Sequence, residues 1–152
     1  MRLFALAASA VVLTACSPAP APVVRSAPDL TTEPWYGETT WKLAAITRDA
    51  GQFLKQGKPD QAAALITSAQ PLEARLLSAA RPTLSAMEAA SDLDRLYGRM
   101  LLSNRHYGWA RLAFQKDEVR WKNWRPQTDE SLRRFKEAQA SVAECDRKMM
   151  EP

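Results

Sequence analysis

The sequence predicts an all-α fold, built as a small bundle or a short solenoid of helical hairpins. Ala, Leu, Gln, Glu, Lys and Arg, which favour helices, abound in residues 35–152. Apolar residues recur there with the period of a helix. The aliphatic β-branched residues, which favour strands, are confined to four positions in this range: Ile46, Ile66, Val119 and Val142.

Three helical segments are expected before residue 82, at about 38–56, 59–70 and 72–80. Gly57 ends the first segment, because glycine commonly follows the last turn of a helix. Pro59 begins the second, since the N–H that proline lacks has no partner in a first helical turn anyway. Pro71 separates the second segment from the third, because a proline inside a helix removes a hydrogen bond.

Three longer helices are expected after residue 82, at about 85–102, 107–124 and 128–149. Ser85 and Glu88 have the spacing of a capping box, so Ser85 is the expected N-cap of the first. Pro126 disfavours helical geometry at the residue before it and so ends the second. Thr128 is the expected N-cap of the third. Cys145 falls on the apolar face of this last helix, where we expect a buried thiol; a disulfide between two chains is the alternative.

A pattern of small and large residues occurs twice in the helical region. The first copy is Ala50, Phe53, Pro59, Ala62 and Ile66. The second copy, 48 residues later, is Gly98, Leu101, Tyr107, Ala110 and Phe114. This order resembles the tetratricopeptide helical hairpin, in which small residues let two helices approach each other. The resemblance implies a protein-binding scaffold. Asp117 stands where that family usually has a small residue, and the offset is longer than the family repeat, so a generic hairpin bundle is the alternative.

The N-terminus has the pattern of an export signal. Arg2 precedes an apolar run, Leu3–Leu13, whose length as a helix would be roughly 16 Å, too short to cross a bilayer. The run ends in Leu13-Thr14-Ala15-Cys16, which resembles the lipobox of bacterial lipoproteins. The resemblance implies that residues 1–15 are a signal peptide that is removed, and that Cys16 then carries lipid and anchors the protein to the bilayer. An ordinary secretory signal or an uncleaved anchor is the alternative.

Residues 16–34 are expected to be the lipid-bearing cysteine and a linker, and residues 35–152 the helical domain. The linker contains five prolines among small residues, a composition that favours an extended chain. Ser17, unlike an aspartate at this position, resembles the sorting residue of outer-membrane lipoproteins. We therefore expect a protein of the cell envelope, held at the outer membrane and facing the periplasm.

Charge and composition argue against several classes of function. The formal net charge is +4, and positive charge gathers in residues 95–125, which favours a local acidic partner over nucleic acid. His106 is the single histidine, and the sequence contains no glycine-rich phosphate loop and no cluster with metal-ligand spacing. We therefore expect neither an enzyme nor a site for a metal or cofactor.

Tryptophans and cations interleave between residues 107 and 125. The candidate binding residues are Trp109, Arg111, Arg120, Trp121, Lys122, Trp124 and Arg125. They could form an exposed groove, because tryptophan stacks on sugars and arginine grips carboxylates or phosphates. Alternatively they pack in the core, since Tyr107, Phe114 and Trp121 fall seven residues apart on one helical face.

These features favour a non-enzymatic envelope lipoprotein whose helical hairpins bind other envelope proteins. The alternative is a module that binds a glycan such as peptidoglycan, or an anionic headgroup, through residues 107–125.

Overall fold

The protein is described by a computed structural model that covers residues 28–151. In this range the chain forms one short 3-10 helix and five α-helices, with no strand, which confirms the predicted all-α class. The elements are η1 (Leu30–Thr32), α1 (Pro34–Lys55), α2 (Pro59–Leu77), α3 (Leu84–Ser103), α4 (Tyr107–Asn123) and α5 (Asp129–Met150). The predicted signal peptide, Cys16 and most of the predicted linker lie outside the described residues.

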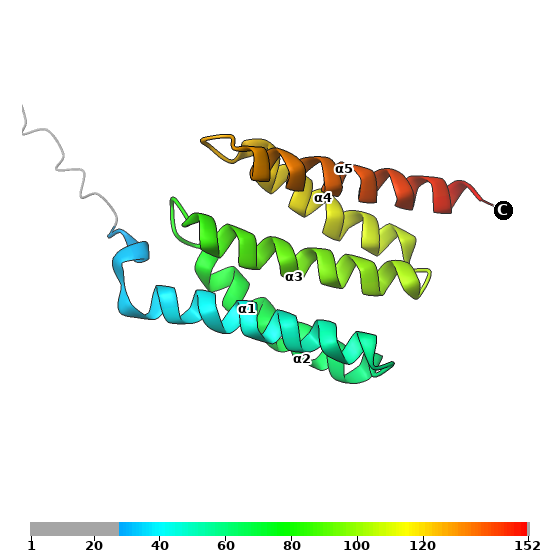
Figure 1. Ribbon diagram of the computed structural model, residues 1–152, viewed down its shortest axis with the longest axis horizontal. Helices are drawn as coiled ribbons and strands as arrows, with labels where there is room; N and C mark the ends of the chain where they lie inside the picture. Colours follow the sequence, from blue (N-terminus) through cyan, green and yellow to red (C-terminus); the bar gives the residue numbers. More distant parts are fainter. Residues whose placement is uncertain (1–27, 152) are drawn as a thin grey trace, which may run out of the picture.

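The five helices lie side by side in an array of hairpins (Figure 1). α1 and α2 form one hairpin, and α3 packs against both of them. α4 packs on the opposite side of α3, and α5 covers α4. α3 is therefore the central helix. Among the described residues, we find no helix whose length and apolar character would let it cross a membrane.

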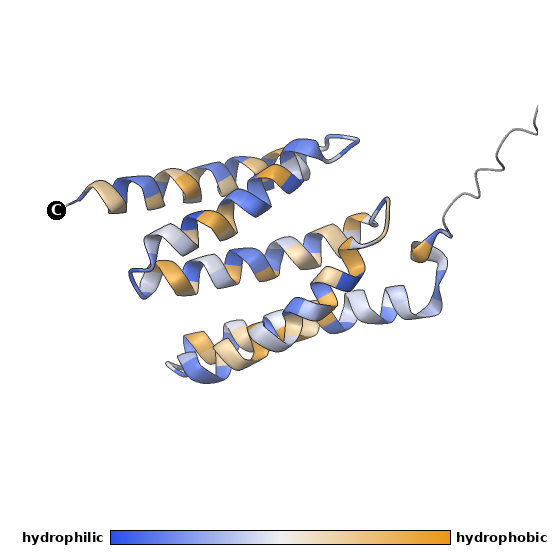
Figure 2. Ribbon diagram, turned by 180° about the vertical axis from the view of Figure 1, so that it is seen from behind, coloured by the Kyte–Doolittle hydropathy of each residue, from blue (hydrophilic) through white to orange (hydrophobic). Residues whose placement is uncertain are grey.

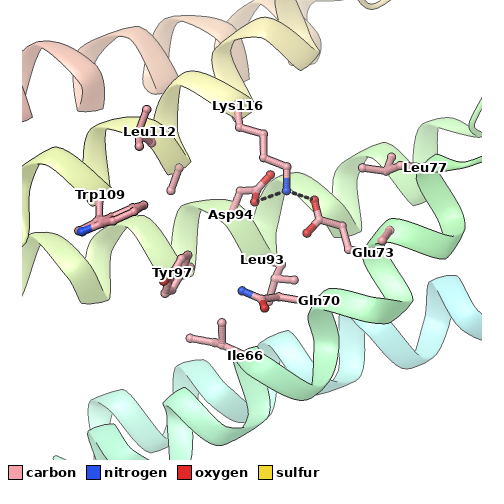
Figure 3. A pocket seen from close by; sticks show the side chains of 12 residues that line it. Ile66, Gln70, Glu73, Leu77, Leu93, Asp94, Tyr97, Trp109, Leu112 and Lys116 are labelled. Atoms are coloured by element: carbon pink, nitrogen blue, oxygen red, sulfur yellow. Dashed lines mark hydrogen bonds and ion pairs between the residues drawn. The ribbon is translucent and has the colours of Figure 1, made fainter.

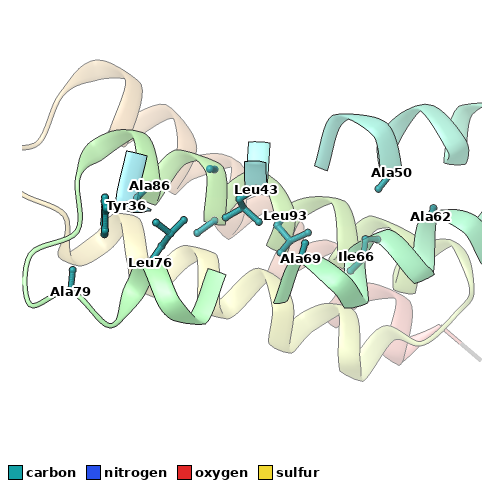
Figure 4. Close-up of a cluster of buried hydrophobic side chains, with 12 residues drawn as sticks. Tyr36, Leu43, Ala50, Ala62, Ile66, Ala69, Leu76, Ala79, Ala86 and Leu93 are labelled. Carbon is teal, nitrogen blue, oxygen red and sulfur yellow. The ribbon is translucent and has the colours of Figure 1, made fainter. Parts of the chain in front are cut away.

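Alanines and medium-sized aliphatic residues fill the core between α1, α2 and α3 (Figure 4). Leu43, Leu76 and Leu93 are almost completely buried there. A smaller cluster between α3, α4 and α5 includes Phe114 and Cys145, and the predicted burial of this cysteine is confirmed. Hydrophobic and hydrophilic residues follow one another along α4 and α5, as expected of helices that bury one face (Figure 2).

α2 continues through Pro71, which corrects the prediction of two shorter helices at this point. An internal proline costs a helix about 3 kcal/mol or more, because one hydrogen bond is lost and the ring crowds the preceding turn. Ala69 and Leu76, on either side of Pro71, are both completely buried, whereas Pro71 itself is exposed. Burial of one continuous apolar face therefore outweighs the local cost of the proline.

The other helix boundaries differ from the predicted ones by a few residues. α1 begins at Pro34, and Leu30 already packs against the core, so the folded part starts within the predicted linker. Thr83, rather than Ser85, caps α3 through its hydroxyl. Thr128 caps α5 as predicted.

The small residues of the repeated pattern are buried in the helical array. Ala50, Ala62 and Ala110 are completely buried. A Cβ atom added at Gly98 would lie 2.6 Å from the ring of Phe114, so only glycine fits this contact between α3 and α4 without a shift. The burial of these small residues agrees with the predicted packing role, and the close contact is shown at Gly98. Descent from the tetratricopeptide family stays a prediction.

Candidate binding groove between α2, α3 and α4

The seven candidate residues of the Trp- and Arg-rich segment do not form one surface. Arg120 and Trp121 are 8% and 0% exposed. The indole Nε1 of Trp121 donates a hydrogen bond of 2.9 Å to Oγ of Ser91, which is also completely buried. Arg120 and Trp121 therefore belong to the core. This corrects their assignment to an exposed groove and supports the alternative that this face of the helix packs inside.

Four of the remaining candidates are held by local contacts or stand in solvent. The guanidinium of Arg111 pairs with Asp146 of α5 at 2.6 Å. Arg125 donates hydrogen bonds to the backbone carbonyls of Lys122 and Trp124. Trp124 is half-buried at the end of α4, and the side chain of Lys122 is exposed.

Trp109 stands at the rim of a groove that α2, α3 and α4 form together (Figure 3). The groove has a volume of about 480 Å³. Its apolar wall includes Ile66, Leu77, Leu93, Tyr97, Leu112 and Ala113. Trp109 is 67% exposed and Leu112 53% exposed. Large exposed apolar side chains beside a concave surface of this size are typical of a binding site.

One end of this groove is polar. Nζ of Lys116 reaches from α4 and donates hydrogen bonds to Oε1 of Glu73 at 2.7 Å and to Oδ1 of Asp94 at 3.0 Å (Figure 3). Arg120 contacts the same two carboxylates, with Nη2 3.0 Å from Oε1 of Glu73 and Nη1 2.7 Å from Oδ2 of Asp94. Nη1 of Arg120 also lies 3.5 Å from Oδ1 of Asp117. We call Glu73, Asp94, Lys116, Asp117 and Arg120 the charge cluster.

The charge cluster is buried except at Lys116. The side chains of Glu73, Asp94 and Arg120 are only 5–7% exposed and that of Asp117 is 0% exposed, whereas that of Lys116 is 51% exposed. Three carboxylates and two cations leave one excess negative charge when all five groups are ionised. Within the described residues, Oδ2 of Asp117 has no hydrogen-bond partner. A buried charge without full compensation is costly, so the cluster favours a further proton or cation.

The pKa values of the cluster reflect this excess. Burial raises the pKa of Asp117 to about 6, and Asp94 adds to the effect, while Ser91 and Arg120 oppose it. Burial and Asp94 also raise the pKa of Glu73, against the influence of Lys116 and Arg120. Burial alone would lower the pKa of Lys116, but the neighbouring carboxylates of Asp94 and Glu73 raise it. Lys116 therefore stays charged at neutral pH.

Glu73, Asp94 and Lys116 were not among the residues predicted from the sequence to form a site. A signal was nevertheless present, because Glu73 stands at helical spacing between Ala69 and Leu76 on the apolar stripe of α2. Acids are almost never fully buried unless they are paired, so an acid in such a stripe indicates a buried partner of opposite charge. The identity of this cationic partner depends on how α4 packs against α2 and α3. Periodicity of the sequence alone does not reveal that packing.

Comparison of the chain with protein-family models, with curated protein sequences and with solved structures found no significant match. Function therefore has to be inferred from the groove, its charges and the N-terminal motif. A groove of this size accommodates a small molecule or a few side chains of a peptide.

Proposed function

We propose that this chain is a non-enzymatic lipoprotein of the bacterial cell envelope, whose helical domain binds a segment of a partner protein in the groove between α2, α3 and α4. The observation that carries the proposal is the pair of exposed side chains, Trp109 and Leu112, beside an apolar wall. Tryptophan is enriched among the residues that dominate the free energy of protein interfaces. An amphipathic segment of a partner would bury its apolar face in such a groove.

The N-terminal motif supports the location. Cys16 would carry two or more acyl chains, and more than one chain is what stable anchoring to a bilayer needs. The proline-rich residues that follow would hold the helical domain away from the membrane surface. Ser17 supports the outer membrane, and the domain then faces the periplasm.

Changing Cys16 to Ala should abolish the incorporation of labelled fatty acid and release the protein from the membrane fraction, because the acyl chains attach at this thiol. Cys145→Ala is the matched control, since this buried thiol is the other cysteine of the chain and should not affect labelling. Continued labelling of the Cys16→Ala protein would exclude lipid attachment at this residue.

Changing Trp109 to Ala should weaken capture of the partner by at least about tenfold, because the large exposed ring of Trp109 would be buried against the partner. Trp41→Ala is the matched control: Trp41 is 69% exposed, close to the 67% of Trp109, but lies on α1 away from the groove lining. Both variants should melt within a few degrees of wild type, since neither residue is buried. The amount of partner protein crosslinked in cells is measured by mass spectrometry for both variants and for wild type. Equal loss with both variants, or with neither, would contradict binding in the groove.

The glycan-binding alternative makes a different prediction for the end of α4. If Lys122, Trp124 and Arg125 bound peptidoglycan, sedimentation with purified peptidoglycan would be lost in a Lys122→Gln, Arg125→Gln double variant and retained in Trp109→Ala. Sedimentation that depends on Lys122 and Arg125 would favour this alternative over the groove.

A further inference from the structure

The ammonium group of Lys116 is the exposed charge at the polar end of the groove. Its side chain is 51% exposed, whereas those of Glu73 and Asp94 are 6% and 7% exposed. An ammonium group has three N–H donors, and two of them bond to these carboxylates. Within residues 28–151, Nζ of Lys116 makes no third hydrogen bond. One N–H donor is therefore available to a ligand in the groove.

The carboxylates behind Lys116 offer no site for a cation of a ligand. Arg120, which is buried, contacts both Glu73 and Asp94, so each carboxylate already has two cationic partners. The excess negative charge of the charge cluster belongs to Asp117, which is 0% exposed and is not part of the groove lining. A Lys or Arg side chain in the groove would therefore lose hydration without gaining a free carboxylate.

An acidic side chain is poorly compensated at the same place. The charge of Lys116 is already shared by Glu73 and Asp94, which both lie within hydrogen-bond distance of Nζ. A third carboxylate at this ammonium group would lie next to the other two, in a site where all three are weakly hydrated. A neutral acceptor, such as an amide carbonyl or a hydroxyl group, satisfies the free N–H donor and adds no charge. The lining also contains an exposed neutral amide, Gln70.

The apolar surface next to Lys116 continues past Trp109. A second hollow shares Tyr97 and Trp109 with the groove and adds Leu101 and His106 to the lining. Lys116 and His106, the N-cap of α4, stand ten residues apart, which corresponds to roughly 15 Å along a helix. A compact small molecule would fill one hollow, whereas a peptide segment can place apolar side chains on both sides of the Trp109 ring (Figure 3).

We propose that the groove recognises an amphipathic segment of the partner protein in which a neutral polar residue, Ser, Thr, Asn or Gln, is flanked by apolar residues. The neutral side chain accepts a hydrogen bond from Nζ of Lys116, and the apolar side chains pack against Tyr97, Trp109 and Leu112. Where such a segment is helical, its backbone carbonyls are bonded within the helix, so a side chain has to supply the acceptor. This inference rests on the proposed function, because it names the chemistry of the segment that the groove would bind.

The test is selection of binders from a random peptide display library on the immobilised full chain, followed by titration of single peptides. Peptides that bind wild type and Trp41→Ala equally, but Trp109→Ala at least about tenfold more weakly, are classed as groove binders. These peptides should carry Ser, Thr, Asn or Gln among aliphatic or aromatic residues. Their affinity should change by less than about twofold between low and moderate salt, because no charge of the peptide is paired.

Replacing the neutral residue of a groove binder by an apolar residue of similar size, such as Thr by Val or Gln by Met, removes the acceptor. Binding to wild type should weaken by at least about fivefold, because a hydrogen bond to a charged donor is lost. This comparison uses the unaltered protein, so it does not depend on the folding of any variant.

Two variants at Lys116 locate the donor. Lys116→Met keeps an unbranched side chain but has no N–H group, so it should weaken the binding of groove peptides by at least about fivefold. Removal of the peptide acceptor should then have little further effect, because both changes remove the same hydrogen bond. Lys116→Arg, which retains N–H donors, is the control and should bind these peptides more tightly than Lys116→Met. Melting curves establish that each variant is folded at the temperature of the titration.

Groove binders that require an acidic or a basic residue, or that tolerate loss of the neutral acceptor, would overturn this inference and leave the groove itself as a binding site. A selection that yields no groove binders at all would contradict both the inference and the proposed function.

Discussion

Asp117 is completely buried in the charge cluster, next to Arg120 and close to Ser91. Its burial raises its pKa to about 6, above the value of 3.8 expected for an exposed aspartate. Between these two values the folded protein binds the proton more tightly than the unfolded chain does. The contribution of Asp117 to the free energy of unfolding therefore falls as the pH rises from about 4 to about 6.

Asp117→Asn should remove this pH dependence. A pKa difference of about two units corresponds to about 3 kcal/mol, so the variant should gain up to that much stability relative to wild type between pH 4 and pH 7. Urea unfolding of both proteins across this range measures the difference. Glu73 also has a raised pKa and changes stability in the same direction, but it is present in both proteins and largely cancels. A constant difference between the two proteins over the whole range would show that Asp117 titrates normally.

Single residues differ in how far the sequence reveals them. Burial of Trp121 and Cys145 could be predicted, because each continues an apolar stripe at helical spacing. The exposure of Trp109 could not be predicted in this way, because Trp109 lies outside the stripe of Tyr107, Phe114 and Trp121, where a tryptophan is compatible with either surface or core. Glu73 and Asp94 could have been suspected from their places in apolar stripes, but their partners come from a helix more than twenty residues further along the chain.

At the level of helices, α3 and α4 cross closely where Gly98 meets the ring of Phe114. Phe114 is almost completely buried, so its ring has little room to move aside. The contact explains why a glycine is found in the middle of α3, where it would otherwise weaken the helix by roughly 0.5–1 kcal/mol relative to alanine.

Gly98→Ala should lower the free energy of unfolding by about 0.5–2 kcal/mol, because an overpacking cost of about 1–3 kcal/mol exceeds the gain in helix propensity. Gly108→Ala, in the first turn of α4, is the matched control, since a Cβ there would meet no atom within 4 Å. The control should raise stability by up to about 1 kcal/mol. Thermal and urea unfolding measure both changes, and two changes of the same sign would mean that the contact at Gly98 is not as close as described.

Helix boundaries show the limits of local signals. Thr128 could be predicted as a cap because two acids, Asp129 and Glu130, follow it and are favoured in the first turn of a helix. Pro71 misled the prediction, because a local rule counts the lost hydrogen bond but not the burial of Ala69 and Leu76 on one continuous face. Thr83 was overlooked as a cap in favour of Ser85, two residues further on.

For the molecule as a whole, the array of helical hairpins follows from composition and periodicity, and the structure confirms it. The groove does not follow from them, because it requires the relative placement of α2, α3 and α4. This packing separates side chains that the sequence predicted to form one binding segment. Arg120 and Trp121 face the core, whereas Trp109 faces solvent at the rim of the groove.

The measurement that tests the central claim most directly is site-specific photocrosslinking in living cells, with a photoreactive residue placed at Leu112 or at Leu132. Leu112 lines the groove, whereas Leu132 is an exposed leucine of α5 outside the groove lining, and the two are 53% and 42% exposed. If the groove binds a partner protein, Leu112 should yield a defined crosslinked product that Trp109→Ala abolishes, and Leu132 should not. Products of equal yield from both positions, or from Leu132 alone, would contradict the groove as the binding site.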